Sequence, residues 1–206
     1  MKPETDIEQR ILEAAEKIFM SKGFAATKTT DIAAKAGCNH ALIHYYFRTK
    51  ENLFEKVFVN MFSVGVGQLT VEIDSVKDIV ELTGKLVSSH LSLVEKRSRL
   101  PLFILNELTT NPARIDMLRN IINNYPLFNE FFFKLEAVLQ REAEEGHIRP
   151  IGAMNYMLNI VSLTIMTVTI LPIFAKAANV DRKGQKSFLE MRREEITQLV
   201  LRGIQL

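Results

Sequence analysis

The stretch GCNHALIHYYFRTKENLF, residues 37–54, carries two histidines, an arginine and a lysine but only one acidic residue, Glu51. At about 100° per residue on a helical wheel, its bulky apolar residues fall on one side: Ile43, Tyr46 and Phe47. The other side carries hydrogen-bonding groups around one small residue: His40, Ala41, His44 and Tyr45. The stretch therefore predicts a short amphipathic helix whose polar face is rich in hydrogen-bond donors.

The neighbouring residues predict helices on both sides of this one. A first helix is expected to end at Gly23, and TTDIAAKA, residues 29–36, forms a second that ends at Gly37. Asn39 is expected to cap the third helix and Thr49 a fourth. Two short helices joined by a glycine-containing turn form a helix-turn-helix, whose second helix presents its outer face to the major groove of DNA.

Helical patterns continue through the rest of the chain, which shows no strand alternation and no internal repeat. Ser75, the pair Asn111 and Pro112, and Pro126 mark later helix starts, and Gly146 is expected to end the helix that begins at Pro126. The predicted fold class is therefore all-α, with an amino-terminal three-helix domain and a larger helical domain after it.

Composition describes a globular protein of a reducing compartment. The chain has 206 residues, of which 47% are hydrophobic, and its single cysteine, Cys38, cannot form an internal disulfide. The amino terminus is too acidic and too periodic for a signal peptide, so a cytoplasmic location is expected. The net charge is only +2, but residues 22–50 hold five basic residues against Asp31 alone. This local excess is typical of a surface that meets a polyanion, although a merely solvated helix face is the alternative.

The stretch RILEAAEKIFMSKGFAATKTTDIAAKAGCNHALIHYYFRTKENLFEKV resembles the amino-terminal DNA-binding region of the TetR family of bacterial transcriptional regulators. The shared features are the Ala-Ala and Ile-Phe pairs of the first helix, the Gly-Phe turn, DIAAKAG, the aromatic run ending at Phe47, and Lys50-Glu51 followed by Leu53. His44 stands where the family most often has tyrosine, which puts its contact in doubt. The resemblance implies a DNA-binding domain over residues 1–49 and a helical effector-binding and dimerisation domain over 50–206, bridged by the helix that starts at Lys50.

The resemblance also implies separate tasks for individual residues. Positions that family members use to hold the phosphate backbone are matched by Thr29, His44, Tyr45 and Lys50. Positions near base edges are matched by Thr30, Asn39, His40 and Ala41. Only the second group would give sequence specificity, because phosphate contacts position a protein without reading bases. The implied function is that of a ligand-responsive regulator, most often a repressor, that binds a palindromic operator as a homodimer.

Two further expectations concern the second domain. The apolar helix at about 152–177 and the last helix hold more apolar surface than one chain readily covers, so we expect a homodimer through these two helices. In the last helix the apolar residues concerned are Phe188, Met191, Ile196, Leu199, Val200 and Ile204. An apolar effector cavity with a few polar groups is the second expectation. Its candidate residues are His90, Phe103, Asn106, Glu107, Phe128 and Phe132, each of which could instead be ordinary core or surface.

Other classes of function find less support in the sequence. No HExxH or GxSxG motif is present, and the GVG at 65–67 lacks a phosphate-loop context, so neither an enzyme nor a cofactor is expected. Cys38, His40 and His44 could be imagined as a metal site, but structural zinc usually takes four ligands, so no metal is predicted. The remaining alternative is a helical membrane or scaffold protein built around residues 151–177, which are long enough to cross a bilayer.

Overall fold

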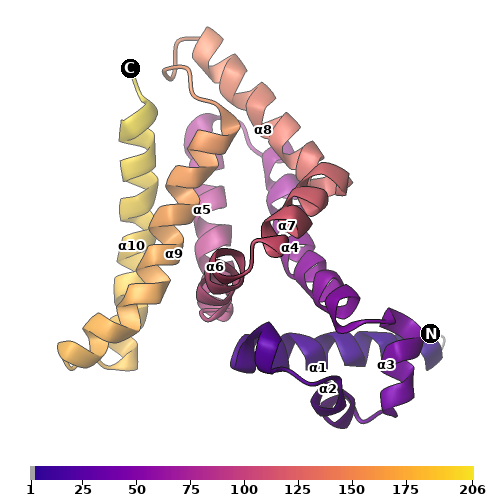
Figure 1. The fold of residues 1–206 in the computed structure, drawn as a ribbon. Helices are drawn as coiled ribbons and strands as arrows, with labels where there is room; N and C mark the ends of the chain where they lie inside the picture. The colour runs from indigo at the N-terminus through magenta and orange to yellow at the C-terminus, as the bar shows by residue number, and fades with distance from the viewer. Residues whose placement is uncertain (1–2) are drawn as a thin grey trace. The chain divides into compact units, whose positions relative to one another are not determined.

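The computed structural model describes residues 3–206, and the side chains of all of these except residues 3–6, 62 and 64. The described residues form ten α-helices and no strand, which confirms the all-α fold class (Figure 1). The helices are α1 (Pro3–Ala26), α2 (Thr29–Ala36), α3 (His40–Phe47), α4 (Lys50–Asp74), α5 (Ile79–Lys96), α6 (Leu100–Thr110), α7 (Ala113–Asn124), α8 (Pro126–Glu144), α9 (Ala153–Ala177) and α10 (Arg182–Ile204).

The chain divides into two compact units that are not continuous in sequence. One unit holds the residues up to Ser63 together with Leu102–Ile121, and the other holds Val64–Pro101 and Ile122–Leu206. Helix α4 contributes to both. The boundary at residue 50, which separates DNA binding from effector binding, is a division by function and stays a prediction. The first unit also contains Leu102–Ile121, most of which belongs to α6 and α7. No local sequence pattern connects this segment to the amino-terminal helices.

The amino-terminal helices form as their sequence indicates. Helix α1 breaks at Gly23, whose backbone has φ 74° and ψ 169°, and a short continuation reaches Ala26. Helix α2 covers TTDIAAKA and ends at Gly37, which has a left-handed φ of 64°. The core of this unit is built from one face of each helix. Its fully buried residues include Ile11, Ala15, Phe19, Ile32, Ile43, Leu53 and Phe54.

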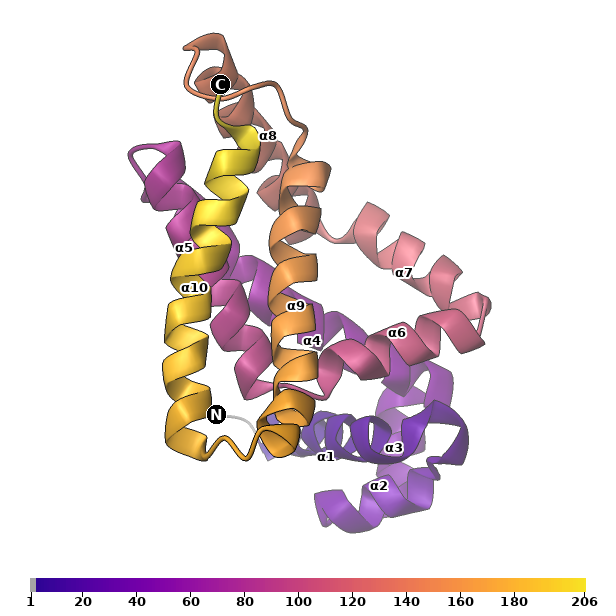
Figure 2. The same ribbon diagram turned by 90° about the vertical axis from the view of Figure 1, so that its left-hand side faces the viewer.

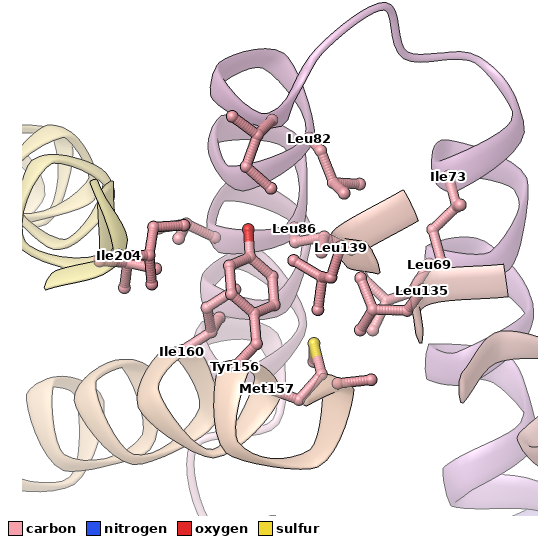
Figure 3. Packing of buried hydrophobic residues seen from close by; sticks show 14 of the residues in the cluster. Leu69, Ile73, Leu82, Leu86, Leu135, Leu139, Tyr156, Met157, Ile160 and Ile204 are labelled. Atoms are coloured by element: carbon pink, nitrogen blue, oxygen red, sulfur yellow. The ribbon is translucent and has the colours of Figure 1, made fainter. Parts of the chain in front are cut away.

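The second unit has its own apolar core, made by the end of α4 together with α5, α8, α9 and α10. Figure 3 shows Leu69 and Ile73 from α4, Leu82 and Leu86 from α5, Leu135 and Leu139 from α8, Tyr156, Met157 and Ile160 from α9, and Ile204 from α10 converging on one volume. Helices α5, α9 and α10 pack on one another, as both ribbon views show (Figures 1 and 2). Each helix buries a stripe, so hydrophobic burial holds the unit together.

Helix starts in the second half of the chain were partly predictable. Pro126 begins α8 as predicted, and the carboxamide of Asn111 accepts a hydrogen bond from Ala113 N (3.1 Å) at the start of α7. The predicted start at Ser75 is wrong, because α5 begins at Ile79 and its cap is Asp78, whose carboxylate accepts from Glu81 N (2.8 Å). Ser75 instead turns back to donate to the Glu72 carbonyl.

The last two helices bury less than half of their apolar residues in a single chain. Helix α9 is long and apolar enough to cross a membrane by length and composition, and only 22% of its most apolar window is buried. Of the six apolar residues assigned from sequence to the dimer face of the last helix, Ile196, Val200 and Ile204 lie instead in the chain's own core. Phe188, Met191 and Leu199 are exposed. The uncovered surface of α10 therefore includes three of the six residues that the sequence suggested, and the other three are wrong as dimer-face residues.

Candidate nucleic-acid interface

Helices α2 and α3 are joined by a tight turn whose backbone bonds are all local. The N–H of Gly37 donates to the Ala34 carbonyl and that of Cys38 to the Ala33 carbonyl, which closes the end of α2. The Asn39 side chain accepts from Ala41 N (2.9 Å) and caps α3, as predicted. Arg10 of α1 donates to the carbonyls of Ala36 and Gly37, so the turn is also held from outside.

The two faces of α3 divide as the helical wheel indicates. Ile43 and Phe47 are buried, with 1% and 4% of their surface exposed, and they lie in the unit to which Ile32 and Ala36 of α2 also contribute buried side chains. Ala41, His44 and Tyr45 are exposed, and Tyr45 keeps 73% of its surface open. The Tyr45 hydroxyl is therefore accessible to a partner on the open face of α3.

Thr29 and His40 are linked to each other. Thr29 Oγ1 lies 2.7 Å from His40 Nε2, and the His40 ring meets the His44 ring edge to face at 4.8 Å. This bond connects the first turn of α2 to the first turn of α3. Among the described residues, no group of the fold bonds to His40 Nδ1, the other ring nitrogen. Thr30, beside Thr29, is exposed. A residue predicted to hold phosphate and one predicted to read bases thus act on each other.

His44 is the position where the sequence departs from the family pattern, and the structure gives that departure a consequence. Its Nδ1 lies 3.1 Å from the Arg48 carbonyl oxygen. Because a carbonyl only accepts, Nδ1 carries the hydrogen and donates it. In the neutral ring, Nε2 is then an acceptor, and a phosphate oxygen also accepts. His44 can therefore donate to a phosphate through Nε2 only when the ring carries a second proton. A tyrosine hydroxyl, in contrast, always has a hydrogen to donate.

Lys50 begins α4 and is already engaged within the protein. Its Nζ donates to the carbonyls of Phe24 and Thr27, both at 3.0 Å, and lies 4.2 Å from the centre of the Phe24 ring. Thr49 caps the same helix, because its hydroxyl oxygen accepts from Asn52 N (3.1 Å). An ammonium group has three N–H donors, so one remains for a phosphate. The phosphate contact of Lys50 stays a prediction, and the structure adds a second role, which is to fasten the end of α1.

A buried ion pair that the sequence did not indicate lies beside these residues. The Glu107 carboxylate accepts from Phe24 N (2.9 Å), next to the break at Gly23, and lies 3.9 Å from Arg114 Nε. The Arg114 guanidinium lies between two rings, 4.0 Å from the centre of Phe24 and 4.1 Å from that of Phe54. Burial lowers the pKa of Arg114, while the negative charge of Glu107 opposes that shift. We call Phe24, Phe54, Glu107 and Arg114 the Phe24 clamp.

The candidate effector residues fall into both units. Phe103, Asn106 and Glu107 belong to the first, where Phe103 packs against Phe54 and the Glu107 carboxylate is taken up by the clamp. His90, Phe128 and Phe132 belong to the second, where the two phenylalanine rings are 5.2 Å apart and half-buried. An effector contact by these residues stays a prediction.

His90 takes part in a polar contact between α5 and α9. Thr164 donates its hydroxyl hydrogen to the Ile160 carbonyl, so the His90 ring, 2.7 Å away at Nδ1, must be the donor of the bond between them. Burial lowers the pKa of His90 to about 4. About two helical turns earlier, Tyr156 makes the same kind of bond to Thr83 (2.6 Å), and burial raises the pKa of that phenol.

The metal alternative can be compared with the geometry. Within the part of the chain that the structure describes, Glu142, Glu145 and His147 at the end of α8 come within metal-ligand distance of one another, but Cys38, His40 and His44 do not. Glu142 of that group is already paired with Arg141 at 3.1 Å.

Known proteins resemble this chain in both sequence and fold. The profile described as "Bacterial regulatory proteins, tetR family" matches residues 11–57. The HTH-type transcriptional regulator YttP of Bacillus subtilis is 27% identical over 161 residues, which cover 76% of this chain and 74% of the relative. The HTH-type transcriptional repressor NicS of Pseudomonas putida is 38% identical over 53 residues, which cover 26% of this chain and 25% of the relative. The crystal structure of the regulator FadR from Bacillus subtilis in complex with stearoyl-CoA aligns with a TM-score of 0.69 over 95% of this chain and 98% of that chain, at 19% identity.

Proposed function

Because the chain belongs to the TetR family and is a DNA-binding transcription regulator, we propose that it represses transcription as a homodimer on a palindromic operator and is released by a small lipophilic effector. The geometry of α2 and α3 is the observation that carries the proposal. A buried face fixes α3 in place while its other face carries Ala41, His44 and Tyr45 in the open. The repressor NicS, which is similar over 53 residues, supports repression as the direction of control.

Base reading falls to the first residues of α3. The Asn39 oxygen is used by the cap, so its amide N–H groups are the part left to meet an acceptor on a base. His40 keeps Nδ1 for the same purpose, and Ala41 permits close approach. Phosphate contacts by Thr29, Tyr45 and the third donor of Lys50 hold the register on the duplex.

Substitutions separate the two tasks. Asn39→Ser keeps a capping oxygen but removes the amide, and should change preference at particular base pairs by about 1–3 kcal/mol with little change in salt dependence. Lys50→Ala should weaken all sequences alike and make the slope of log affinity against log salt shallower by about 1.8 for a dimer. Duplexes selected from a random pool by the unaltered protein provide the probe, in binding titrations over a salt series. A pool from which the unaltered protein selects nothing would reject the operator proposal.

Dimerisation is supported by the uncovered apolar faces of α9 and α10. Exposed apolar residues recur along both helices, among them Met154, Leu158, Met166, Ile173, Met191 and Leu199. Two helices from each of two chains would cover these faces as a four-helix interface with twofold symmetry. Such a dimer would present two copies of α3 to half-sites about 34 Å apart, which is one turn of the duplex. The proposed location of this dimer is the cytoplasm.

Effector control is proposed on two grounds. The solved relative in complex with stearoyl-CoA has the same fold, and Phe128 and Phe132 offer apolar surface in the second unit. In the chain, the segment Leu102–Ile121 is preceded and followed by residues of the second unit. Its contacts in the Phe24 clamp, however, are with residues of the first unit. A ligand that moves the flanking helices would therefore pull on the end of α1 and shift the population of DNA-binding forms.

Acyl chains give a direct test of the effector. Stearoyl-CoA, free stearate and coenzyme A are each added to the protein, and the melting temperature and the affinity for the selected duplex are measured. A lipophilic effector should raise the melting temperature and weaken DNA binding together. Stabilisation without any change in DNA affinity would remove the regulatory part of the proposal, and the DNA-binding part would be unaffected.

A further inference from the structure

Arg48 lies in a strained turn between α3 and α4. Its backbone has φ 64° and ψ −53°, and Thr49 N donates to the Phe47 carbonyl at 2.7 Å. Together these features define a γ-turn with positive φ, which is rare and unfavourable for a residue that has a side chain. Among the described residues, the only other non-glycine position with positive φ is Asn179, a residue type that tolerates this region.

Both sides of this turn are fixed by the helices that it joins. Arg48 N donates to the His44 carbonyl at 3.0 Å, and His44 Nδ1 donates in return to the Arg48 carbonyl at 3.1 Å. On the other side, Thr49 caps α4. The turn is therefore held beside His44, on the open face of α3, and its strain is maintained by contacts on both flanks.

Nothing in the fold accounts for an arginine in this place. The side chain is exposed, and no side chain among the described residues pairs with its guanidinium. Glycine would adopt the same backbone without strain. The charge gives no clear preference of its own, because Arg48 lies at the carboxyl end of α3, where a cation is favourable, as well as before the amino-terminal end of α4, where it is unfavourable. The local structure would thus be more stable with glycine at position 48.

We propose that Arg48 binds a backbone phosphate of the operator and that the γ-turn presents its guanidinium there. The inference rests on the DNA-binding function of α3. Arginine suits the task because its planar fork can bind two phosphate oxygens at once. Arg48 is a better phosphate ligand than Lys50, because the Lys50 ammonium already donates to two carbonyls whereas the Arg48 guanidinium donates to no side chain that the structure describes.

Arg48→Gly tests this role through two readouts that should move in opposite directions. Removal of the strain should raise the melting temperature by about 2–4 °C. Removal of one phosphate contact per chain should make the slope of log affinity against log salt shallower by about 1.8 for the dimer, to a similar degree on the selected duplex and on an unselected duplex of equal length. A merely structural role would move stability and binding in the same direction.

Two control variants complete the experiment. Arg48→Lys keeps the charge and should keep most of the slope, and Lys77→Ala removes an exposed charge from the turn before α5 and should leave the slope unchanged. An Arg48→Gly protein that is more stable but has an unaltered salt slope would overturn the phosphate contact, and one that is less stable would overturn the strain argument. If the unaltered protein fails to bind either duplex, the DNA-binding function itself fails, which is a different outcome from either.

Discussion

The first unit should be sensitive to substitutions that leave one charge of the Phe24 clamp buried without its partner. Both charged side chains are 8% exposed, and their nearest charged atoms are 3.9 Å apart. At an effective dielectric constant of about 20, that separation corresponds to an attraction of about 4 kcal/mol, which desolvation of the two charges largely offsets. Arg114→Met should therefore destabilise the protein by about 3–5 kcal/mol, because it leaves the Glu107 carboxylate buried without its cation and removes two cation–π contacts.

A double-mutant cycle isolates the pair. Glu107→Gln keeps an acceptor for Phe24 N but removes the charge, and Arg114→Met with Glu107→Gln removes both charges. Urea unfolding of the four proteins should give a coupling energy of about 1–3 kcal/mol, so that the double variant is more stable than the sum of the single losses implies. Additivity within about 0.5 kcal/mol would refute the reasoning, because it would mean that Glu107 and Arg114 are buried side by side without acting on each other.

Two more predictions follow from other parts of the molecule. Leu158→Glu with Met191→Glu should convert the proposed dimer to monomers in analytical ultracentrifugation, because both side chains are exposed in one chain and would bury unpaired charges at the interface. Val71→Glu changes an equally exposed apolar position on α4 and should leave the protein dimeric. A dimer that survives the double change has its interface elsewhere. The pKa of His90 is lowered to about 4 from 6.5, so as the pH falls the imidazole is protonated in the unfolded chain before it is protonated in the folded one. The contribution of neutral His90 to the free energy of unfolding is therefore complete above pH 6.5 and is lost as the pH falls toward 4. Between pH 7.5 and pH 5 this loss amounts to about 2 kcal/mol, and it should be absent from His90→Gln in urea unfolding at the two pH values; an equal loss in the variant would assign the pH dependence to other groups.

The amino-terminal helices were predictable because every signal that defines them is local. Gly37 ends α2 through its own backbone conformation, and Asn39 and Thr49 cap the next helices with their own side chains. The two faces of α3 follow from a period of 3.6 residues. These cues act within a few residues of one another, so a single sequence contains all of the information that they need.

The parts that the sequence left open depend on contacts between distant residues. Glu107 and Arg114 are more than 80 residues from Phe24, and no spacing rule connects them; a polar pair inside an apolar segment was the one available signal. The start of α5 was misplaced because Ser75 and Asp78 are both good capping residues, and only the packing of Ile79 and Leu82 into the core decides between them. Arg48 was counted as charge alone, since positive φ at a residue other than glycine or asparagine leaves no trace in the sequence.

The surroundings of α9 favour the proposed dimer over the membrane alternative for residues 151–177. Helix α9 packs on α5 and α10, so a bilayer that surrounded α9 would also have to surround these two helices. Helix α10 exposes Glu194, Glu195 and Arg202 between its apolar residues, and α5 joins α9 through polar bonds from His90 and to Thr83. Burying these charges in hydrocarbon would cost several kcal/mol each. A second copy of the same two helices would cover the apolar residues without taking Glu194, Glu195 and Arg202 into hydrocarbon, so self-association is the less costly way to bury this surface.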